Sequence, residues 1–357
     1  MSTVIATDPG AGHLAPPAHR TITMAHGGGG RAMRDLVADL FLPAFDNPAL
    51  AVLEDQAQLD PGGLAVPGAR LAFTTDGFVV RPLVFPGGDI GKLAVCGTVN
   101  DLAVGGATPL ALSCAVVIEE GFDLVLLAGI VASMRAAAAE AGVSIVTGDT
   151  KVVERGAADG LFITTAGVGV VAPGVALSAA AARPGDAVLV NGPLGDHGAT
   201  ILVARGDLAL ETELQSDCRP LNGLMQALLR AAPGTRCARD ATRGGVAAVL
   251  NEIAGSASVG IRLVEETVPV RPAVRGVCEI LGLDPLHLAN EGTAVAIVPA
   301  DEAGAALAAW RAHPYGAGAR IIGSVAEAPR GRVTLRTSLG GERLLDLPLG
   351  DPLPRIC

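Results

Sequence analysis

Apolar runs with the spacing of strands alternate with apolar runs that have the spacing of helices, and this alternation occurs twice along the chain. Such a pattern is typical of domains in which helices pack on a sheet. In the first half we expect, in order, helix 31–45, strand 70–80, helix 90–105, helix 122–141, strand 144–153 and strand 161–171. The pair Pro173-Gly174 ends this series, because proline cannot continue a helix or a central strand.

The second half begins a new series after the turn at 183–186. We expect strands at 187–191, 293–298, 319–325 and 332–337, and helices at 198–205, 221–232, 244–254 and 301–312. A chain of 357 residues is long enough for two domains. We therefore predict an α/β fold of the α+β type with a flexible leader (1–21), an N-terminal domain (22–172), a C-terminal domain (173–339) and a mobile tail (340–357).

The composition predicts a compact globular protein with no nucleic-acid or membrane partner. Apolar residues make up 50% of the chain and charged residues 17%. The net charge is −10, from 26 basic and 36 acidic residues, which disfavours a polyanionic partner. Aromatic residues are only 3% of the chain, so platforms for base stacking are not expected.

No segment predicts export or insertion into a membrane. The first twenty residues contain prolines and no apolar run, unlike a signal peptide. The uncharged stretch 161–182 is long enough to raise the question of a membrane span, but glycines and Pro173 interrupt it. The six cysteines are widely spaced without a C-x-x-C pair, which favours reduced thiols. We expect a cytoplasmic protein in which all cysteines except the last are buried small hydrophobes.

The chain ends at Cys357, behind Pro348, Pro352 and Pro354. These prolines favour a semi-extended arm that can swing. A terminal thiol on such an arm is suited to carrying a group between sites. The other interpretation is a disordered end with an incidental cysteine, and the tail alone does not decide between them.

A run of four glycines, Gly27, Gly28, Gly29 and Gly30, stands directly before the first expected helix. Backbone N–H groups in such a run can surround an anion at a helix N-terminus, although a plain hinge is the commoner explanation. Two better-known nucleotide motifs are absent. Gly91-Lys92 lacks the Ser or Thr of a Walker A loop, and the glycine pattern at 167–172 is not followed by a helix.

Several carboxylates stand in apolar surroundings, where a buried charge is costly unless it is paired. They are Asp55, Asp76, Asp101, Asp149 and Asp240. Each alone is explained as a cap or a turn residue. Together they predict a magnesium–nucleotide site, because Mg²⁺ prefers oxygen ligands. Cations for the phosphates come from Lys92, Lys151 and Arg243.

Two further residues are candidates for chemistry. Glu291 precedes an expected strand and is a candidate general base, or a structural cap. His197 opens an expected helix and is expected to be structural rather than catalytic.

These segments together resemble one family closely. They are Ala25–Gly30, Phe85–Leu93, Gly148–Val153, Gly195–Thr200, Asp240–Val246, Asn290–Gly292 and Pro354–Cys357. From about residue 22 to the end, the chain resembles the HypE family, the carbamoyl dehydratases of nickel–iron hydrogenase maturation. That family belongs to the ATP-dependent superfamily similar to aminoimidazole-ribonucleotide synthetase. The terminal Pro-Arg-Ile-Cys is the most specific part of the resemblance, because the superfamily relatives lack it.

The resemblance implies a reaction, cofactors and partners. A HypF-type carbamoyltransferase would carbamoylate Cys357, ATP would drive dehydration to a thiocyanate, and the cyano group would pass to iron on a HypC–HypD complex. It also implies a homodimer that pairs the N-terminal sheets. The implied metal positions are Asp55, Asp76, Asp101 and Asp240, and the implied nucleotide positions are Gly27–Gly30, Asp89, Lys92, Asn100, Asp149 and Arg243.

General chemistry agrees with this reaction. Phosphorylating an amide oxygen converts it into a good leaving group, and phosphoryl transfer depends on positioning and charge neutralisation. We expect Lys151 to assist that transfer and Glu291 to accept an amide proton. Two rival functions remain open: an ATP-dependent synthetase acting on a small molecule, and a non-catalytic carrier of a group on Cys357.

Overall fold

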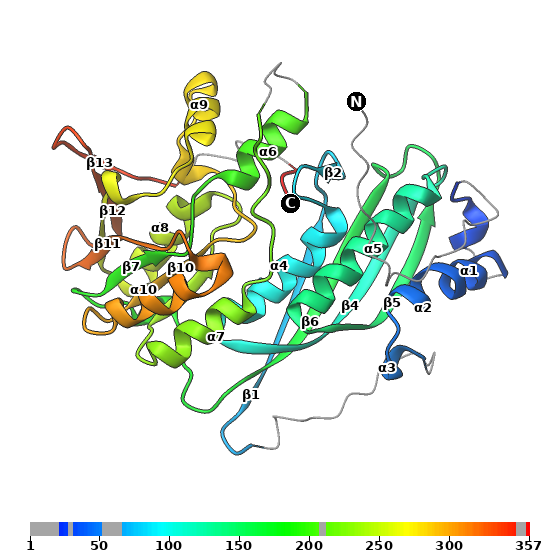
Figure 1. Cartoon of the computed structure of the whole chain (residues 1–357), viewed down its shortest axis with the longest axis horizontal. Coiled ribbons are helices and arrows are strands. Elements are labelled where there is room, and N and C mark those ends of the chain that lie inside the picture. The colour runs from blue at the N-terminus through cyan, green and yellow to red at the C-terminus, as the bar shows by residue number, and fades with distance from the viewer. Residues whose placement is uncertain (1–20, 28–30, 52–65, 207–211, 348–354) are drawn as a thin grey trace.

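The computed structural model describes residues 21–27, 31–51, 66–206, 212–347 and 355–357, and it shows two domains side by side, each built on its own sheet (Figure 1). Residues 1–20 of the predicted leader lie outside the described residues. Thr21 forms a β-bridge with Asp123, so the first described residue already pairs with the N-terminal domain.

The N-terminal sheet has four strands in the order β1-β6-β4-β5. Their bounds are β1 Arg70–Phe78, β4 Ala107–Glu119, β5 Ser144–Val153 and β6 Leu161–Val171. Strands β4 and β5 are parallel and are joined by helix α5 (Leu124–Ala141), whereas β1 and β4 both pair antiparallel with β6. The predicted alternation is therefore a true βαβ unit only at β4–α5–β5. Strand β4, the longest strand among the described residues, was not predicted.

Helix α4 (Ile90–Val104) and helix α5 cover the inner face of this sheet. Almost every residue of α4 is buried, because the C-terminal domain covers the side that the sheet leaves free. The two helices approach closely at Gly91, where an added Cβ would lie 2.6 Å from the Ile130 carbonyl oxygen. Gly91 therefore serves helix packing, consistent with the absence of a Walker A loop.

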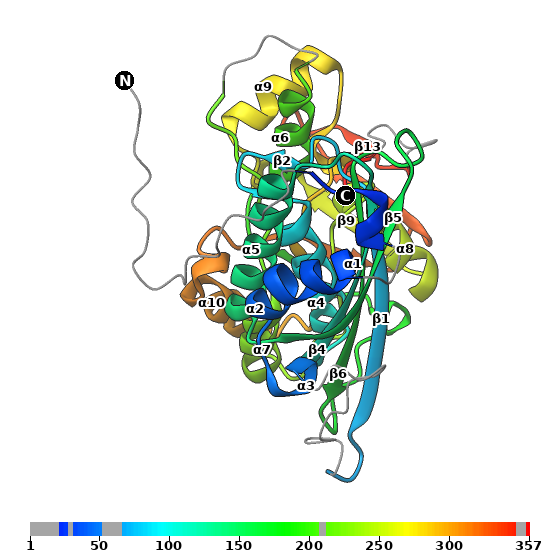
Figure 2. The same ribbon diagram turned by 90° about the vertical axis from the view of Figure 1, so that its right-hand side faces the viewer.

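Short N-terminal helices lie along strand β5, beside α5 (Figure 2). They are η1 (Met24–Gly27), α1 (Arg31–Leu36), η2 (Val37–Phe41), α2 (Leu42–Ala44) and α3 (Pro48–Ala51). A small hairpin, β2 (Val84–Phe85) with β3 (Gly88–Asp89), precedes α4. The expected helix 31–45 is thus confirmed as a set of short helical segments.

The C-terminal sheet has seven strands in the order β13-β12-β9-β11-β7-β10-β8. The strands are β7 Ala187–Val190, β8 Cys237–Asp240, β9 Gly260–Val264, β10 Ala294–Val298, β11 Arg320–Ala326, β12 Arg332–Arg336 and β13 Glu342–Leu344. The helices are α6 Asp196–Ala204, α7 Asn222–Ala231, α8 Gly245–Ala257, α9 Pro272–Leu281 and α10 Ala303–Ala312, with short 3-10 turns at Ala179–Ala181, Glu265–Thr267, Pro285–His287 and Pro314–Gly316. Of these, β8, β9, β13 and α9 were not predicted, and β13 lies in the segment that was predicted to be a mobile tail.

Helices cover both faces of this second sheet at its centre. One face of β7 and β10 packs against α8, and the other face packs against α7 and α10 around Trp310. Strand β13 pairs with β12, and Leu345 behind it is buried. The beginning of the predicted tail therefore belongs to the C-terminal domain.

Among the described residues, one helix, α5, is both long enough and apolar enough to cross a membrane, judged by length and composition alone. Leu127, Ile130 and Met134 on one side of α5 are buried in the domain core against α4 and the sheet. This is the ordinary burial of a core helix. All six cysteines are unpaired thiols and all are buried, which confirms that prediction for the five internal ones.

Candidate active site

The last three residues lie between the two domains, beside α4 and the β2–β3 hairpin (Figure 1). They run antiparallel to residues 79–81, which continue β1: the Val79 N–H donates to the Cys357 carbonyl at 3.3 Å, and the Arg81 N–H donates to the Arg355 carbonyl at 3.2 Å. Only 9% of Cys357 is exposed. The terminal thiol is therefore docked inside the molecule.

The Cys357 thiol faces three residues that the sequence analysis selected. Burial is the main cause of its raised pKa, and the carboxyls of Glu291 and Asp76 raise the pKa further. A hydrogen bond and the charge of Arg243 act in the opposite direction. The thiol therefore lies close enough to the carboxyls of Glu291 and Asp76 and to the Arg243 guanidinium for their charges to act on it. Arg243 was predicted as a nucleotide ligand, whereas the structure places it at the sulfur.

A carboxylate that the sequence analysis missed holds Glu291 in place. Asp217 accepts hydrogen bonds from the Glu291 N–H at 2.9 Å, the Gly292 N–H at 3.0 Å and the Thr293 hydroxyl at 3.0 Å. Glycine is required at position 292, because a Cβ there would lie 1.8 Å from the Asp217 carbonyl oxygen. Asp217 lies in an irregular segment, and no local pattern marks it.

Glu291 itself is almost completely buried, and its Oε1 has no hydrogen-bond partner among the described residues. Burial raises its pKa well above the ordinary value, and the neighbouring Cys218 and Asp217 add to the effect. An unpartnered oxygen on a buried carboxyl is costly, so it indicates a place where a ligand supplies the missing partner. Its position beside the Cys357 thiol makes Glu291 a candidate general base.

Three of the predicted metal ligands lie near one another. Burial raises the pKa values of Asp76 and Asp101, and it raises the pKa of Asp240 to about 7, with the charges of Asp101 and Asp76 adding to the shift at Asp240. Asp101 also accepts a hydrogen bond from Thr74 at 2.8 Å. These oxygens suit Mg²⁺, whose charge would relieve the repulsion. However, no group of three or more His, Cys, Asp or Glu in the described part of the chain is arranged to hold one metal ion. Asp55 lies outside the described residues.

Two residues predicted as nucleotide ligands, Asp89 and Asn100, form hydrogen bonds within the protein. Asp89 caps α4: its Oδ1 accepts from the N–H groups of Gly91 and Lys92 and from the Ser133 hydroxyl. The Asn100 amide ties α4 to the C-terminal domain, because it donates to the carbonyls of Arg219 and Glu291 and accepts from the Leu221 N–H. Nucleotide roles for Asp89 and Asn100 stay predictions.

The remaining predicted ligands are spread along the N-terminal domain. Lys92 donates to the Gly87 carbonyl at 3.0 Å. Asp149 and Lys151 form an exposed ion pair at 3.0 Å on β5, the edge strand opposite β1, so they lie apart from Asp76 within one chain. Gly27 ends the first 3-10 turn, and Gly28, Gly29 and Gly30 lie outside the described residues.

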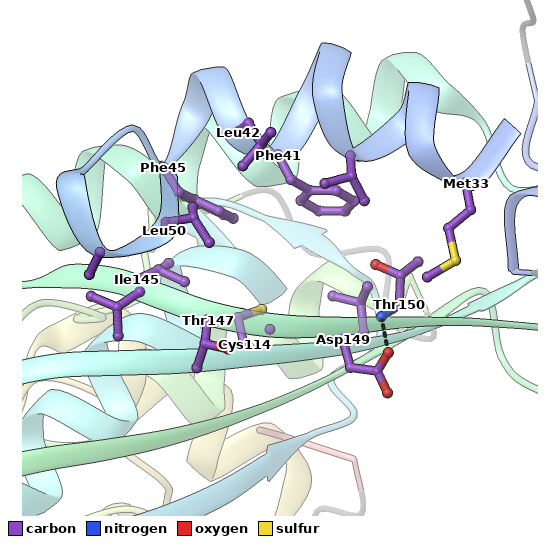
Figure 3. Close-up of a pocket in the computed structure, with 15 residues that line it drawn as sticks. Met33, Phe41, Leu42, Phe45, Leu50, Cys114, Ile145, Thr147, Asp149 and Thr150 are labelled. Carbon is purple, nitrogen blue, oxygen red and sulfur yellow. Dashed lines mark hydrogen bonds between the residues drawn. The ribbon is translucent and has the colours of Figure 1, made fainter. Parts of the chain in front are cut away.

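A cavity of about 210 Å³ lies between the short N-terminal helices and strands β4 and β5 (Figure 3). Its lining is mostly apolar, with side chains such as Met33, Phe41 and Ile145, and Asp149 and Thr150 lie at one end. Asp149, one of the residues predicted to surround the nucleotide, therefore borders an open space in the N-terminal domain.

Two family models match the chain and define its class. The N-terminal domain of AIR synthase related proteins matches residues 54–171, and the C-terminal domain of the same proteins matches residues 183–336. The two-domain fold is thus that of an AIR synthase related protein.

Closer relatives identify the family within that class. The chain is 60% identical to the carbamoyl dehydratase HypE of Rhodobacter capsulatus, over 94% of this chain and 98% of that protein. It is 54% identical to HypE of Escherichia coli K12, over 94% of this chain and 99% of that protein. A solved structure of HypE in complex with ATP superimposes with a TM-score of 0.89 at 49% identity, covering 94% of this chain and 99% of that chain. The chain belongs to the HypE family of carbamoyl dehydratases, enzymes of hydrogenase maturation.

Proposed function

We propose that this enzyme uses ATP to dehydrate an S-carbamoyl group on its own Cys357 to an S-cyanate, the source of a cyanide ligand for hydrogenase iron. The docking of the Cys357 thiol beside Glu291 and Arg243 carries this proposal. A chain whose terminal sulfur is placed next to a buried base needs no affinity for a free small substrate, because the substrate is tethered.

The proposed reaction has two stages, phosphorylation of the carbamoyl oxygen and loss of phosphate. The carbamoyl oxygen on Cys357 attacks the γ-phosphorus of ATP, and ADP leaves. The nitrogen then loses two protons, and the C–O bond to phosphate breaks as the nitrile forms. Glu291 takes one of these protons, the departing phosphate carries the other, and Arg243 orients the group on the sulfur. Mg²⁺, held through Asp76, Asp101, Asp240 and Asp55, would neutralise charge on the phosphates.

We infer the cofactors from two kinds of support. The matched HypE structure was solved with ATP, and both family models belong to AIR synthase related proteins. For Mg²⁺ the support is the set of neighbouring carboxylates whose pKa values are raised. Lys151, Asp149, Lys92 and the Gly27–Gly30 run remain the proposed nucleotide residues.

The proposed partners follow from the family and from the buried thiol. A HypE–HypF complex superimposes on this chain with a TM-score of 0.76 at 48% identity, covering 88% of this chain and 99% of that chain. A HypF-type carbamoyltransferase cannot reach a thiol that is only 9% exposed, so the tail must leave its docked position to be carbamoylated. We also propose a HypC–HypD complex as the cyano acceptor, and the cytoplasm as the location.

We propose that the outer face of the N-terminal sheet pairs with a second copy of the chain. Leu71 is 60% exposed and Phe73 is 69% exposed on edge strand β1, and no described element covers this face. Phe73→Glu should convert a dimer into a monomer in light-scattering chromatography. Val125→Glu, which changes an equally exposed residue on α5, should leave the dimer intact. A dimeric Phe73→Glu protein would exclude this face.

Intact mass spectrometry tests the reaction itself. After incubation with the carbamoylating partner, addition of ATP should remove one water from the protein-bound carbamoyl group, and Cys357→Ser should never gain the group. Asp76→Asn should gain it and keep it. Cys237→Ser, at a buried thiol in the C-terminal domain, should behave like the unmodified protein.

The rival functions give different results in the same experiment. A protein lacking Cys357 that still converts a soluble substrate with ATP would support a small-molecule synthetase. Transfer of an unchanged group with no consumption of ATP would support a carrier.

A further inference from the structure

We propose that His197 is a positioning residue that holds the Ile356 carbonyl and thereby sets the Cys357 thiol beside Glu291. This inference rests on the proposed function, because it assigns His197 a role in that reaction. Its test measures only the docking of the tail and does not require the dehydration reaction. His197 was expected to be structural, and in the structure it has a specific partner in the tail.

The contact is short and fully buried. His197 Nε2 lies 2.7 Å from the Ile356 carbonyl oxygen, and neither residue is exposed by more than 1%. A carbonyl oxygen can only accept a hydrogen bond, so Nε2 must carry the proton. In neutral imidazole Nδ1 is then an acceptor.

A second, partly buried contact supplies the matching donor. His197 Nδ1 lies 2.7 Å from the Ser216 hydroxyl, and that oxygen accepts the Cys218 N–H at 3.1 Å. The hydroxyl proton is therefore directed to Nδ1, which fixes the tautomer that donates to the tail. The imidazole also packs edge to face against the ring of Phe85, with the two ring centroids 5.5 Å apart.

The other contacts to the tail differ in kind. The Arg355 and Cys357 carbonyls accept backbone N–H groups of Arg81 and Val79, which any extended segment could make. Arg205 adds a partly buried guanidinium contact to the Arg355 carbonyl at 3.0 Å. Among these described contacts, His197 alone is a completely buried side chain, and it binds the residue directly before the thiol.

This arrangement explains how a tail that must leave can return to one position. An unpaired His197 Nε2–H in a closed pocket would lack its partner when the tail is absent, and burying a polar group without a partner is unfavourable. The docked tail restores that partner. The Ile356 side chain, buried in the main core, adds apolar stabilisation to the same position.

The reaction of Cys357 with a small thiol-alkylating reagent tests the proposal on the full-length protein. In His197→Leu the undocked population, and with it the labelling rate of Cys357, should rise about tenfold, as expected for the loss of one buried hydrogen bond. His197→Gln, whose amide can donate at a similar position, should restore most of the protection. The five other buried cysteines are internal controls and should label no faster.

A kinetic measurement separates positioning from general structure. His197→Leu should slow single-turnover dehydration about tenfold while the affinity for ATP stays unchanged. His313→Gln is the matched control, because the described contacts of His313 are with Tyr315 and not with residues 355–357. Ser216→Ala should show a smaller increase in Cys357 labelling, and it also serves if His197→Leu fails to fold.

Two outcomes would overturn the proposal. One is a wild-type labelling rate of Cys357 in both the His197→Leu and Ser216→Ala proteins. The other is equally faster labelling of all six cysteines, which would mean that His197 only stabilises the fold. Because labelling needs neither ATP nor a carbamoyl group, failure of the proposed dehydration would leave this result readable.

Discussion

The two sheets differ in how their faces are covered. In the C-terminal sheet, β7 and β10 are buried on both faces, between α8 on one side and α7 with α10 on the other. In the N-terminal sheet, α4 and α5 cover one face, while β1 exposes Leu71 and Phe73 on the other. The centre of the C-terminal sheet is thus covered on both faces, whereas the N-terminal sheet has an exposed apolar face of the kind that binds a partner.

The same contrast extends to the site residues. In the C-terminal domain, Glu291 and His197 are buried and held by fixed hydrogen-bond partners. In the N-terminal domain, Asp149 and Lys151 are exposed, and Asp76 is only half-buried. We infer that the C-terminal domain provides a preformed half of the site, and that ATP, metal and a second subunit complete the other half.

The largest expected effect concerns that preformed half. Glu291→Gln should lower the rate of nitrile formation by about 10²–10⁴-fold, the usual contribution of a general base. Binding of ATP, measured by calorimetry, should stay the same. Glu279→Gln, at an exposed glutamate of α9, should have wild-type kinetics. A Glu291→Gln protein that no longer binds ATP would show that Glu291 has a structural role.

The next effect compares the two sheets directly. Ile297→Ala creates a cavity in the fully buried strand β10 and should lower the free energy of unfolding by about 2–5 kcal/mol. Phe73→Ala on the open face of β1 should change it by less than about 0.5 kcal/mol in dilute protein. Urea denaturation measures both. Equal losses would mean that the outer face of the N-terminal sheet is packed like a core.

The smallest effect is a pH dependence within the C-terminal domain. Burial raises the pKa of Asp196 from 3.8 to about 6, although Arg271 donates to its carboxylate at 2.8 Å. Between these two values the folded protein keeps a proton that the unfolded chain has lost, so the free energy of unfolding falls as the pH rises through this window.

Denaturation of Asp196→Asn between pH 4 and pH 7 checks this linkage. The free energy of unfolding of the variant should lack the decrease that Asp196 causes. Its stability relative to the wild type should therefore increase with pH. Asp301→Asn, which changes an exposed carboxylate, should follow the wild-type curve. A stability difference between Asp196→Asn and wild type that does not change with pH would contradict the raised pKa.

The hydrophobic pattern predicted most elements but not all. Strands β5, β6 and β10 have apolar runs bounded by polar or glycine-rich segments, and these predictions are confirmed. Strand β4 was missed because Pro109 and several small residues weaken its pattern between two helices. Its pairing with β5 and β6 on both sides, which local sequence does not encode, is what makes it a strand.

The sequence by itself determined the two-domain class, the terminal cysteine and the family, since short motifs and apolar spacing are local properties of the chain. Only the tertiary structure decided which of those motifs meet. Packing of α4 between the domains and the return of residues 355–357 to β1 bring Asp76, Glu291, Arg243 and Cys357 together, and leave Lys151 on the far edge. Contacts between residues so distant in sequence depend on how whole elements pack, and this information is absent from any local pattern.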